Sequence, residues 1–505
     1  MTRPYSGAGV GNGGKTVSET GPYAQIRETH TSVVFFVGDR VHKMKKPLDL
    51  GFLDNRTRAA RESMCHREVD LNRRLAPDVY LGVADVHGPD GQVCEHLVEM
   101  RRLPDERRLA ALVARGENID SVVDSVARQI AGLHAESPQD PAIDRCATVD
   151  FLTDLWSQSL DHLERLPVGI DAAAVLAKIR TSATRYLEGR GPLFAARIAD
   201  GRAVDGHGDM LADDIFCLDD GPRIIDCLEF DDELRYGDGA LDIAFLAMDL
   251  ERLGARDSAH RLMRAYAEFS GDACPATLMH HYIAYRALVR AKVTALRHDQ
   301  GDAASREVSL GLLGQVARNL GRGRVRLVLV GGLSATGKTT VSRLLGEHLD
   351  AVVLRSDVIR KELAGLDPAT DASAGVDSGL YAREHTDATY DELLRRARIA
   401  LSFGTSVVLD ATWLSESRRA EARRAGAEAT ADVIEIECCA DPAVLLRRII
   451  SRRERGDDAS DATPAVLDEQ LHRREEWPTA QVIDTTDGTL PDTERLDGMV
   501  GPGPW

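Results

Sequence analysis

The sequence lacks the features of a secreted, disulfide-bonded or membrane-spanning protein. Its eight cysteines form no C-x-x-C pair and have no histidine at a metal-ligand spacing, so neither a disulfide framework nor a structural zinc site is indicated. No apolar signal region follows the N-terminus, and no uninterrupted apolar run reaches about 18 residues. We therefore expect a soluble, cytoplasmic protein that does not enter a membrane.

An excess of positive charge is also missing. The chain has 63 Lys and Arg against 81 Asp and Glu, a formal net charge of −18. This charge repels a polyanion at long range, which disfavours extended nucleic-acid binding but leaves room for a basic patch that holds a nucleic-acid end. Small-molecule substrates are the expectation, and the oligomeric state is not visible in the sequence.

The length of 505 residues predicts more than one domain. Changes in texture along the chain indicate a Gly-rich disordered tail, a strand-rich segment, a mainly helical segment, a segment of alternating strands and helices, and a C-terminal tail. In that order, the expected ranges are 1–22, 23–103, 104–320, 326–490 and 491–505. Alternation of strand and helix predicts a parallel sheet between helices, so the fold class is a combination of α+β and α/β.

Two stretches fit the phosphate-loop pattern G-x-x-x-x-G-K-[ST], namely Gly9–Thr16 and Gly332–Thr339. Such a loop needs a buried strand before it and a helix after it, so that backbone N–H groups point at the phosphates. RLVLVG precedes the second match and KTTVSRLLGEHL follows it, whereas a polar tail precedes the first and Gly-Pro at 21–22 prevents a full helix. The sequence therefore predicts one nucleotide site, at the second match.

The phosphate loop predicts a bound ATP and Mg²⁺. Lys338 is expected to reach the β- and γ-phosphates and to act in catalysis, and Thr339 is expected to ligate Mg²⁺. The predicted nucleotide-binding residues are Gly332, Ser334, Gly337, Lys338, Thr339 and Thr340.

Polar residues at the ends of later strands predict the rest of this site. Asp357 follows VVLRS and is placed to accept the proton of an acceptor hydroxyl, while Arg360 one turn later is placed to hold an anionic group of the substrate. A helix-capping aspartate and a solvated arginine are the alternative. Asp410 ends the strand predicted within SVVLDATW and is expected to support Mg²⁺.

A run of arginines precedes the Gly/Asp-rich segment GDDASDA. Arg448, Arg452 and Arg455 share one face of the predicted helix, and Arg452 and Arg455 are predicted to act on the transferring phosphoryl group as part of a lid. A solvated helix face is the alternative.

Together GLSATGKT, SDVIR, VVLDATW and the arginine helix resemble a group of P-loop kinases over residues 326 to about 488. The group includes polynucleotide 5′-kinases, zeta-type toxins, gluconate kinase and adenylylsulfate kinase. The resemblance implies phosphoryl transfer from ATP to a hydroxyl group, and it does not specify the acceptor.

The first half of the chain has a second set of acidic residues. HGDMLADDIFCLDDGPRIIDCLEF holds His207, Asp209, Asp214 and Asp226 in a predicted strand-turn-strand. Phosphoryl transfer needs one carboxylate beside the attacking hydroxyl and others to hold Mg²⁺. Asp209 and Asp226 are placed to face each other across such a hairpin.

With RVHKMKK, Glu68 on a helix and VEMRRLP upstream, this half resembles the aminoglycoside phosphotransferase and choline kinase group, which has the bilobal protein-kinase fold. The resemblance implies lobes at 23–103 and 104–320. It makes Asp209 the catalytic base, Asp226 a metal ligand, and Lys43 or Lys45 the phosphate-binding lysine paired with Glu68. Strand alternation places both lysines on one face, so the choice stays open.

One residue departs from that family. Asp214 stands where the family has asparagine, and as a metal ligand it adds negative charge to the site. The leading hypothesis is a bifunctional enzyme with two ATP-dependent phosphotransferase domains that act on hydroxyls of small molecules. The alternatives are a regulator in which the first half binds nucleotide without turnover, and a second half that phosphorylates a nucleotide sugar or a nucleic-acid 5′ end.

Overall fold

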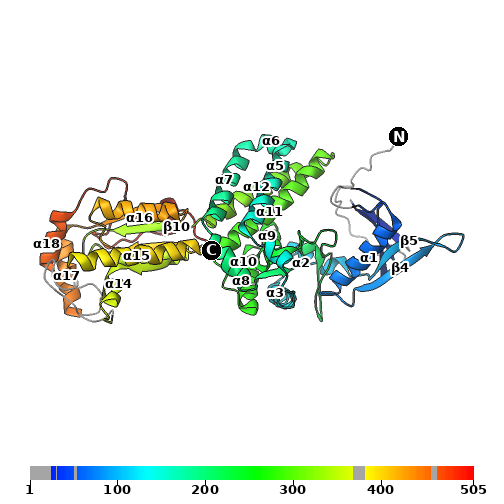
Figure 1. Ribbon diagram of the computed structural model, residues 1–505, viewed down its shortest axis with the longest axis horizontal. Coiled ribbons are helices and arrows are strands. Elements are labelled where there is room, and N and C mark those ends of the chain that lie inside the picture. The colour runs from blue at the N-terminus through cyan, green and yellow to red at the C-terminus, as the bar shows by residue number, and fades with distance from the viewer. Residues whose placement is uncertain (1–23, 30, 50–53, 368–381, 456–462, 505) are drawn as a thin grey trace.

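The computed structural model describes residues 24–29, 31–49, 54–367, 382–455 and 463–504. Three bodies lie in a row (Figure 1). An antiparallel sheet lies at one end, a helical body lies in the middle, and a parallel sheet between helices lies at the other end. The chain therefore has the expected fold class, with an α+β part followed by an α/β part.

The first sheet has the strand order β1-β2-β3-β5-β4, and its pairs are antiparallel. Its strands are β1 (Ala24–Glu28), β2 (Ser32–Val37), β3 (Arg40–Lys45), β4 (Tyr80–His87) and β5 (Val93–Arg101). Helix α1 (Arg58–Asn72) packs against β4 and β5, with Cys65 and Val69 buried. Strands β2 and β3 form a hairpin, and Gly38 supplies the positive φ of 58° at its turn.

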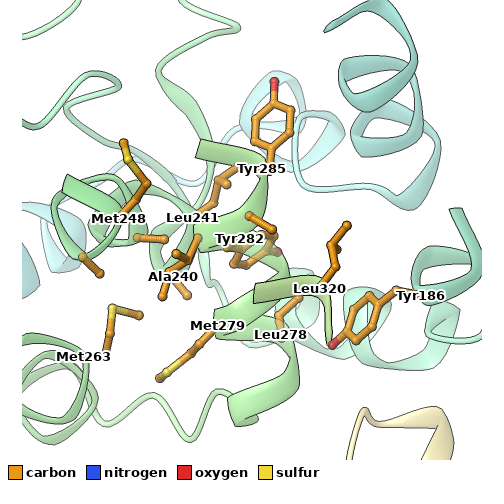
Figure 2. Close-up of a cluster of buried hydrophobic side chains, with 14 of the residues drawn as sticks. Tyr186, Ala240, Leu241, Met248, Met263, Leu278, Met279, Tyr282, Tyr285 and Leu320 are labelled. Carbon is orange, nitrogen blue, oxygen red and sulfur yellow. The ribbon is translucent and has the colours of Figure 1, made fainter. Parts of the chain in front are cut away.

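The helical body surrounds a large apolar core. Figure 2 shows part of this core, in which α9, α10 and α11 bring together Leu241, Met263 and Tyr282. Its helices are η1 (Asp105–Arg107), α2 (Leu109–Ala114), α3 (Asp120–Ala135), α4 (Pro141–Arg145), α5 (Val149–Glu164), α6 (Pro167–Asp171), α7 (Ala173–Glu188), α8 (Gly191–Ala199), η2 (Ala212–Asp214), α9 (Gly239–Arg252), α10 (Arg256–Ser270), α11 (Ala276–Asp299) and α12 (Ser305–Arg322).

Two short antiparallel pairs lie against these helices and carry the predicted acidic segment. They are β6 (Ala203–Asp205) with β9 (Tyr236–Asp238), and β7 (Ile215–Leu218) with β8 (Gly221–Ile224). The β7–β8 hairpin lies between Asp214 and Asp226 in the sequence. Because its two strands pair, the residues at its two ends lie close together in space.

The second large sheet has the order β11-β12-β10-β13-β14 and all its pairs are parallel. Its central strand β10 is buried along its whole length, as the apolar run RLVLVG predicts. The strands are β10 (Arg326–Gly331), β11 (Val352–Arg355), β12 (Val407–Asp410), β13 (Asp432–Cys439) and β14 (Gln481–Asp484). The helices are α13 (Lys338–Leu349), α14 (Ser356–Leu363), α15 (Arg383–Ser402), α16 (Glu416–Glu428), α17 (Pro442–Arg455), α18 (Pro464–Arg473) and α19 (Thr493–Val500).

The final segment differs from the tail expected at 491–505. Asp492 caps α19, whose Leu496 and Val500 are buried in the core beside α13. These two apolar residues lie four positions apart and so share a helix face. The segment is therefore part of the second domain's core and not a tail that extends away from it.

The helical body and the second domain are joined by direct contacts. Thr277 Oγ1 donates to the Gly404 carbonyl at 2.6 Å, and Arg190 Nη1 donates to the Ala429 carbonyl at 2.6 Å. His280 Nε2 lies 2.6 Å from the Pro504 carbonyl, and the C-terminus accordingly lies at this junction in Figure 1. Within the described ranges, no helix is long and apolar enough to cross a membrane.

Candidate functional sites

The predicted strand-loop-helix around the second phosphate-loop match is confirmed. The strand β10 ends at Gly331 and α13 begins at Lys338. Gly332 has a φ of 128°, and a Cβ there would lie 2.2 Å from the Cys438 carbonyl oxygen, so only glycine fits. The order of buried strand, glycine-containing loop and helix is the one that a phosphate-binding loop requires. The first match at Gly9–Thr16 lies outside the described residues.

Thr339 and Asp410 meet at the carboxyl ends of the central strands. Thr339 Oγ1 donates to Asp410 Oδ2 at 2.7 Å. Burial raises the pKa of Asp410, while the nearby Lys338 charge lowers it. A hydroxyl and a buried carboxylate are oxygen donors of the kind Mg²⁺ prefers, so these two residues fit the metal implied by the fold. Ser334 is buried in the loop, and Thr340 is exposed on the first turn of α13.

Asp357 and Arg360 form an ion pair on α14. Arg360 Nη1 lies 3.0 Å from Asp357 Oδ1, and the arginine is 9% exposed. The capping position of α14 belongs to Arg355, not Asp357. The pair therefore matches neither the capping aspartate nor the solvated arginine of the alternative interpretation, and its carboxylate lies close enough to raise the pKa of Asp410.

The arginine helix divides into two parts. Arg448 donates to the Ala335 carbonyl at 3.3 Å and to the Thr485 carbonyl at 2.5 Å, which ties α17 to the phosphate loop. Arg452 and Arg455 belong to α17, but their side chains and residues 456–462 lie outside the part that the structure describes. Their role at a lid stays a prediction.

In the first domain both candidate lysines contact Glu68. Lys43 Nζ lies 2.9 Å from Glu68 Oε1 and 2.8 Å from Asp226 Oδ1, whereas Lys45 Nζ lies 2.5 Å from Glu68 Oε2 and also bonds Glu229. Burial opposes the charge of Lys43, but these carboxylates hold its pKa well above the ordinary value. The two lysines therefore differ in the second carboxylate that they contact, which is Asp226 for Lys43 and Glu229 for Lys45.

The loop of Asp209 is held by a buried carboxylate on α9. Asp242 accepts the N–H groups of His207 and Gly208, both at 2.8 Å, and lies 3.1 Å from His134 Nε2. Burial would raise the pKa of Asp242, but the bond from His134 and the neighbouring positive charges hold it well below the usual range. A charged acceptor therefore holds this loop at neutral pH.

Burial raises the pKa of Asp209, and the charges of two α11 arginines, Arg290 and Arg286, oppose the increase. A carboxylate in this setting is a better proton acceptor than an exposed one. Asp209 thus lies among groups that can tune a general base.

Asp214 and Asp226 lie near Asp209 in one acidic cluster. Burial, and then the charges of Asp226 and Asp209, raise the pKa of Asp214 well above its ordinary value. Lys43 lowers the pKa of Asp226, whose φ of 64° is uncommon for a non-glycine residue. In the described residues no group of three or more His, Cys, Asp or Glu is arranged to hold a metal. Two carboxylates still fit Mg²⁺, which is usually completed by phosphate oxygens and water.

Sequence reasoning missed several residues of these sites: His134, Glu229, Arg286, Arg290, Gln470 and Thr485. Gln470 Oε1 accepts a hydrogen bond from the Ser334 N–H at 2.8 Å. Thr485 Oγ1 accepts a hydrogen bond from Arg448 Nη1 at 3.0 Å. The four-residue spacing of Arg286 and Arg290 was a usable signal, since it places both on one helix face. His134 and Gln470 carry no local signal.

The two sites lie toward opposite ends of the molecule. Figure 1 shows α17 and α18, which contact the phosphate loop, at one end, and α1 with β4 and β5 at the other. The helical body lies between them.

Comparison with known proteins agrees with this division. A family profile described as "AAA domain" matches residues 327–477. "Uncharacterized protein Rv2004c" of Mycobacterium tuberculosis is 41% identical over 464 residues, which cover 92% of this chain and 93% of the relative. "Uncharacterized protein Mb2027c" of Mycobacterium bovis has the same identity and coverage.

Two solved structures are similar to parts of this chain. A choline/ethanolamine kinase family protein from Mesorhizobium loti has 17% identity and a TM-score of 0.38, covering 60% of this chain and 88% of that one. A putative kinase from Chloroflexus aurantiacus has 24% identity and a TM-score of 0.29, covering 35% of this chain and 93% of that one.

Proposed function

This chain belongs to the same family as the mycobacterial relatives, and we propose that it is a bifunctional ATP-dependent phosphotransferase. Each domain would transfer the γ-phosphoryl group to a hydroxyl of a small molecule, with Mg²⁺ as the metal. The observation that carries the proposal is that each half places a lysine close to a carboxylate that could hold a metal. These are Lys43 with Asp226, and Lys338 beside Thr339 and Asp410.

In the first domain each residue of the site has a separate proposed role. Lys43, held by Glu68, orients the phosphates, and Asp226 with Asp214 would hold Mg²⁺, which supplies charge neutralisation when bound. The oxygen of the acceptor hydroxyl forms a bond to the γ-phosphorus, and the bond between that phosphorus and the ADP oxygen breaks. Asp209 accepts the proton that the hydroxyl loses. The Asp242 contacts keep Asp209 in place.

In the second domain the loop N–H groups and Lys338 bind the phosphates, and Thr339 with Asp410 would hold Mg²⁺. Asp357 accepts the acceptor proton and Arg360 orients the acceptor. Arg452 and Arg455 are proposed to neutralise charge on the transferring group.

The test is transfer of labelled phosphate from Mg·ATP into a fractionated small-molecule extract. Wild type, Asp209→Ala and Lys338→Ala are compared, with Arg264→Ala on α10 as the control because this exposed side chain contacts neither site. We expect two sets of products, one lost in each site variant. Background turnover with every acceptor fraction would contradict the proposal.

Asp214 favours a second candidate, in which the first domain binds nucleotide and regulates the second. Burial, and then repulsion by Asp226 and Asp209, raises the pKa of Asp214, and a retained proton would weaken a metal site. That candidate predicts products lost only in Lys338→Ala. An Asp214→Asn variant that gains transfer activity in the first domain would support it.

A third candidate is an end kinase, which a 5′-hydroxyl oligonucleotide tests directly. We propose a cytoplasmic location and no membrane partner.

A further inference from the structure

A cavity of about 570 Å³ lies at the junction of the helical body and the second domain. Its walls come from α7, α11 and α12 on one side, and from Val325 and Asp432 at the amino ends of β10 and β13 on the other. The phosphate loop follows the opposite, carboxyl end of β10. The cavity therefore belongs to neither candidate catalytic site.

The charged residues of the cavity are mostly basic. Lys178, Arg185, Arg190 and Arg324 line it, with Asp432 as the acidic member. Asp432 is shared by two of them, since Arg185 lies 3.1 Å and Arg324 2.5 Å from its oxygens. In a protein of net charge −18, this leaves a local excess of positive charge at the cavity.

Arg190 is the unusual member, because it is 1% exposed and takes part in none of the ion pairs between described residues. Its Nη1 donates to the carbonyls of Gly189 and Ala429, and its Nε is buried without a hydrogen-bond partner in the described chain. A buried cation without a carboxylate partner is costly, and an anion beside it would compensate that cost.

An aromatic wall lies next to this cation. The rings of Tyr186 and His281 stack with centroids 4.5 Å apart and an 18° angle, and the Arg190 guanidinium lies 5.5 Å from the Tyr186 centroid. His281 Nε2 accepts from Trp156 Nε1 at 3.1 Å, so the neutral ring carries its proton on Nδ1, which is buried without a partner among the described residues. Figure 2 shows Tyr186 with Leu320, another lining residue, at the edge of the apolar core.

We propose that this cavity binds a small phosphomonoester with a planar or apolar body. The phosphate would lie at Lys178 and Arg190, and the body would lie against Tyr186 and Leu320. Because Val325 and Asp432, at the amino ends of β10 and β13, line the same cavity, a ligand bound there would lie between the two domains. The proposal does not depend on transfer activity of either domain.

The test is isothermal titration with phenyl phosphate, with both nucleotide sites first saturated by a non-hydrolysable ATP analogue and Mg²⁺. Ser182→Trp fills the cavity from an exposed position on α7, and Lys178→Glu reverses a charge at an exposed position. Arg264→Glu on α10 is the matched control, because it reverses an exposed charge that does not line the cavity.

We expect both cavity variants to weaken phenyl phosphate binding about tenfold or more, a loss of about 1.4 kcal/mol, and the control to bind like wild type. Inorganic phosphate and phenol, tested separately, are expected to bind more weakly than phenyl phosphate. Unchanged melting temperatures show that the variants are folded. Absence of binding to wild type, or equal binding by wild type and both cavity variants, would overturn the proposal.

Discussion

At the scale of single residues, the two lysines of β3 have different second partners and so different expected roles. Lys43 joins Asp226 and is 16% exposed, whereas Lys45 is 2% exposed and joins Glu229. In a Lys338→Ala background, which leaves only the first nucleotide site, we expect Lys43→Ala to reduce kcat/KM of the first domain about 100-fold. The measurement is labelled-phosphate transfer with the extract fraction that this domain uses.

Lys45→Ala is the matched comparison. It leaves the Glu229 carboxylate without the cation that it contacts, so the main effect is a loss of about 3 kcal/mol in the free energy of unfolding, measured by urea titration. Equal losses of turnover in the two variants, at equal stability, would contradict the assignment of Lys43 as the phosphate-binding lysine.

The charge of Arg290 is expected to influence the pH at which Asp209 loses its proton, and therefore the pH dependence of activity. The arginine charge lowers the pKa of Asp209, which burial raises, so Arg290→Gln will raise that pKa further. A general base works only when deprotonated, and activity will therefore be lost at a higher pH on acidification than in wild type. The pH profile of kcat/KM for the first domain measures this. Arg297→Gln, at an exposed position on the same helix, is expected to leave the profile unchanged.

At the scale of elements, the turn between β10 and α13 depends on glycine. In Gly332→Ala the new Cβ would meet the Cys438 carbonyl, so β13 or the loop must shift and nucleotide binding by the second domain is expected to be lost. Gly488→Ala is the control, since Gly488 also has a positive φ but a Cβ there meets nothing within 4 Å. Titration with an ATP analogue in an Asp226→Ala background checks both variants, and equal affinities would refute the steric argument.

The contact between α9 and the Asp209 loop predicts a pH-dependent stability. Asp242→Asn removes a charged acceptor from two buried N–H groups, and we expect a loss of about 3 kcal/mol in the free energy of unfolding at pH 7. The folded pKa of Asp242 is depressed, so its contribution is full above the unfolded pKa of about 3.9 and disappears as the pH falls through the folded value. Urea titrations at pH 7 and below pH 4 are expected to show the difference between variant and wild type shrinking, and a constant difference would contradict this.

At the scale of the whole molecule, the last residues connect the two domains. The Pro504 carbonyl accepts from buried His280, and the Pro502 carbonyl accepts from buried Arg326 at 3.1 Å. Deleting residues 502–505 leaves both donors without these acceptors, at about 1–3 kcal/mol each. We expect calorimetry to show a lower melting temperature and a separate transition of the second domain. An unchanged single transition in the deletion variant would argue against the coupling.

How much could be predicted depended on how far apart the participating residues lie in sequence. The phosphate loop was predictable because strand, glycines, lysine and hydroxyl follow one another within a few residues, and the β2–β3 hairpin was predictable for the same reason. His134 and Asp242 meet in the structure, but 108 positions separate them, so no local pattern could pair them.

The sequence by itself determined the local features of this protein. These are the buried strand before the phosphate loop, the glycine at Gly332, where the backbone of a neighbouring strand comes too close for a side chain, and the order of acidic residues in each half. Only the tertiary structure decided which partner each β3 lysine takes, that the two sites face opposite ends, and that a basic cavity lies where the domains meet. The physical reason is that these arrangements depend on packing between distant segments, and charge and burial at a residue are set by neighbours that its local sequence does not contain.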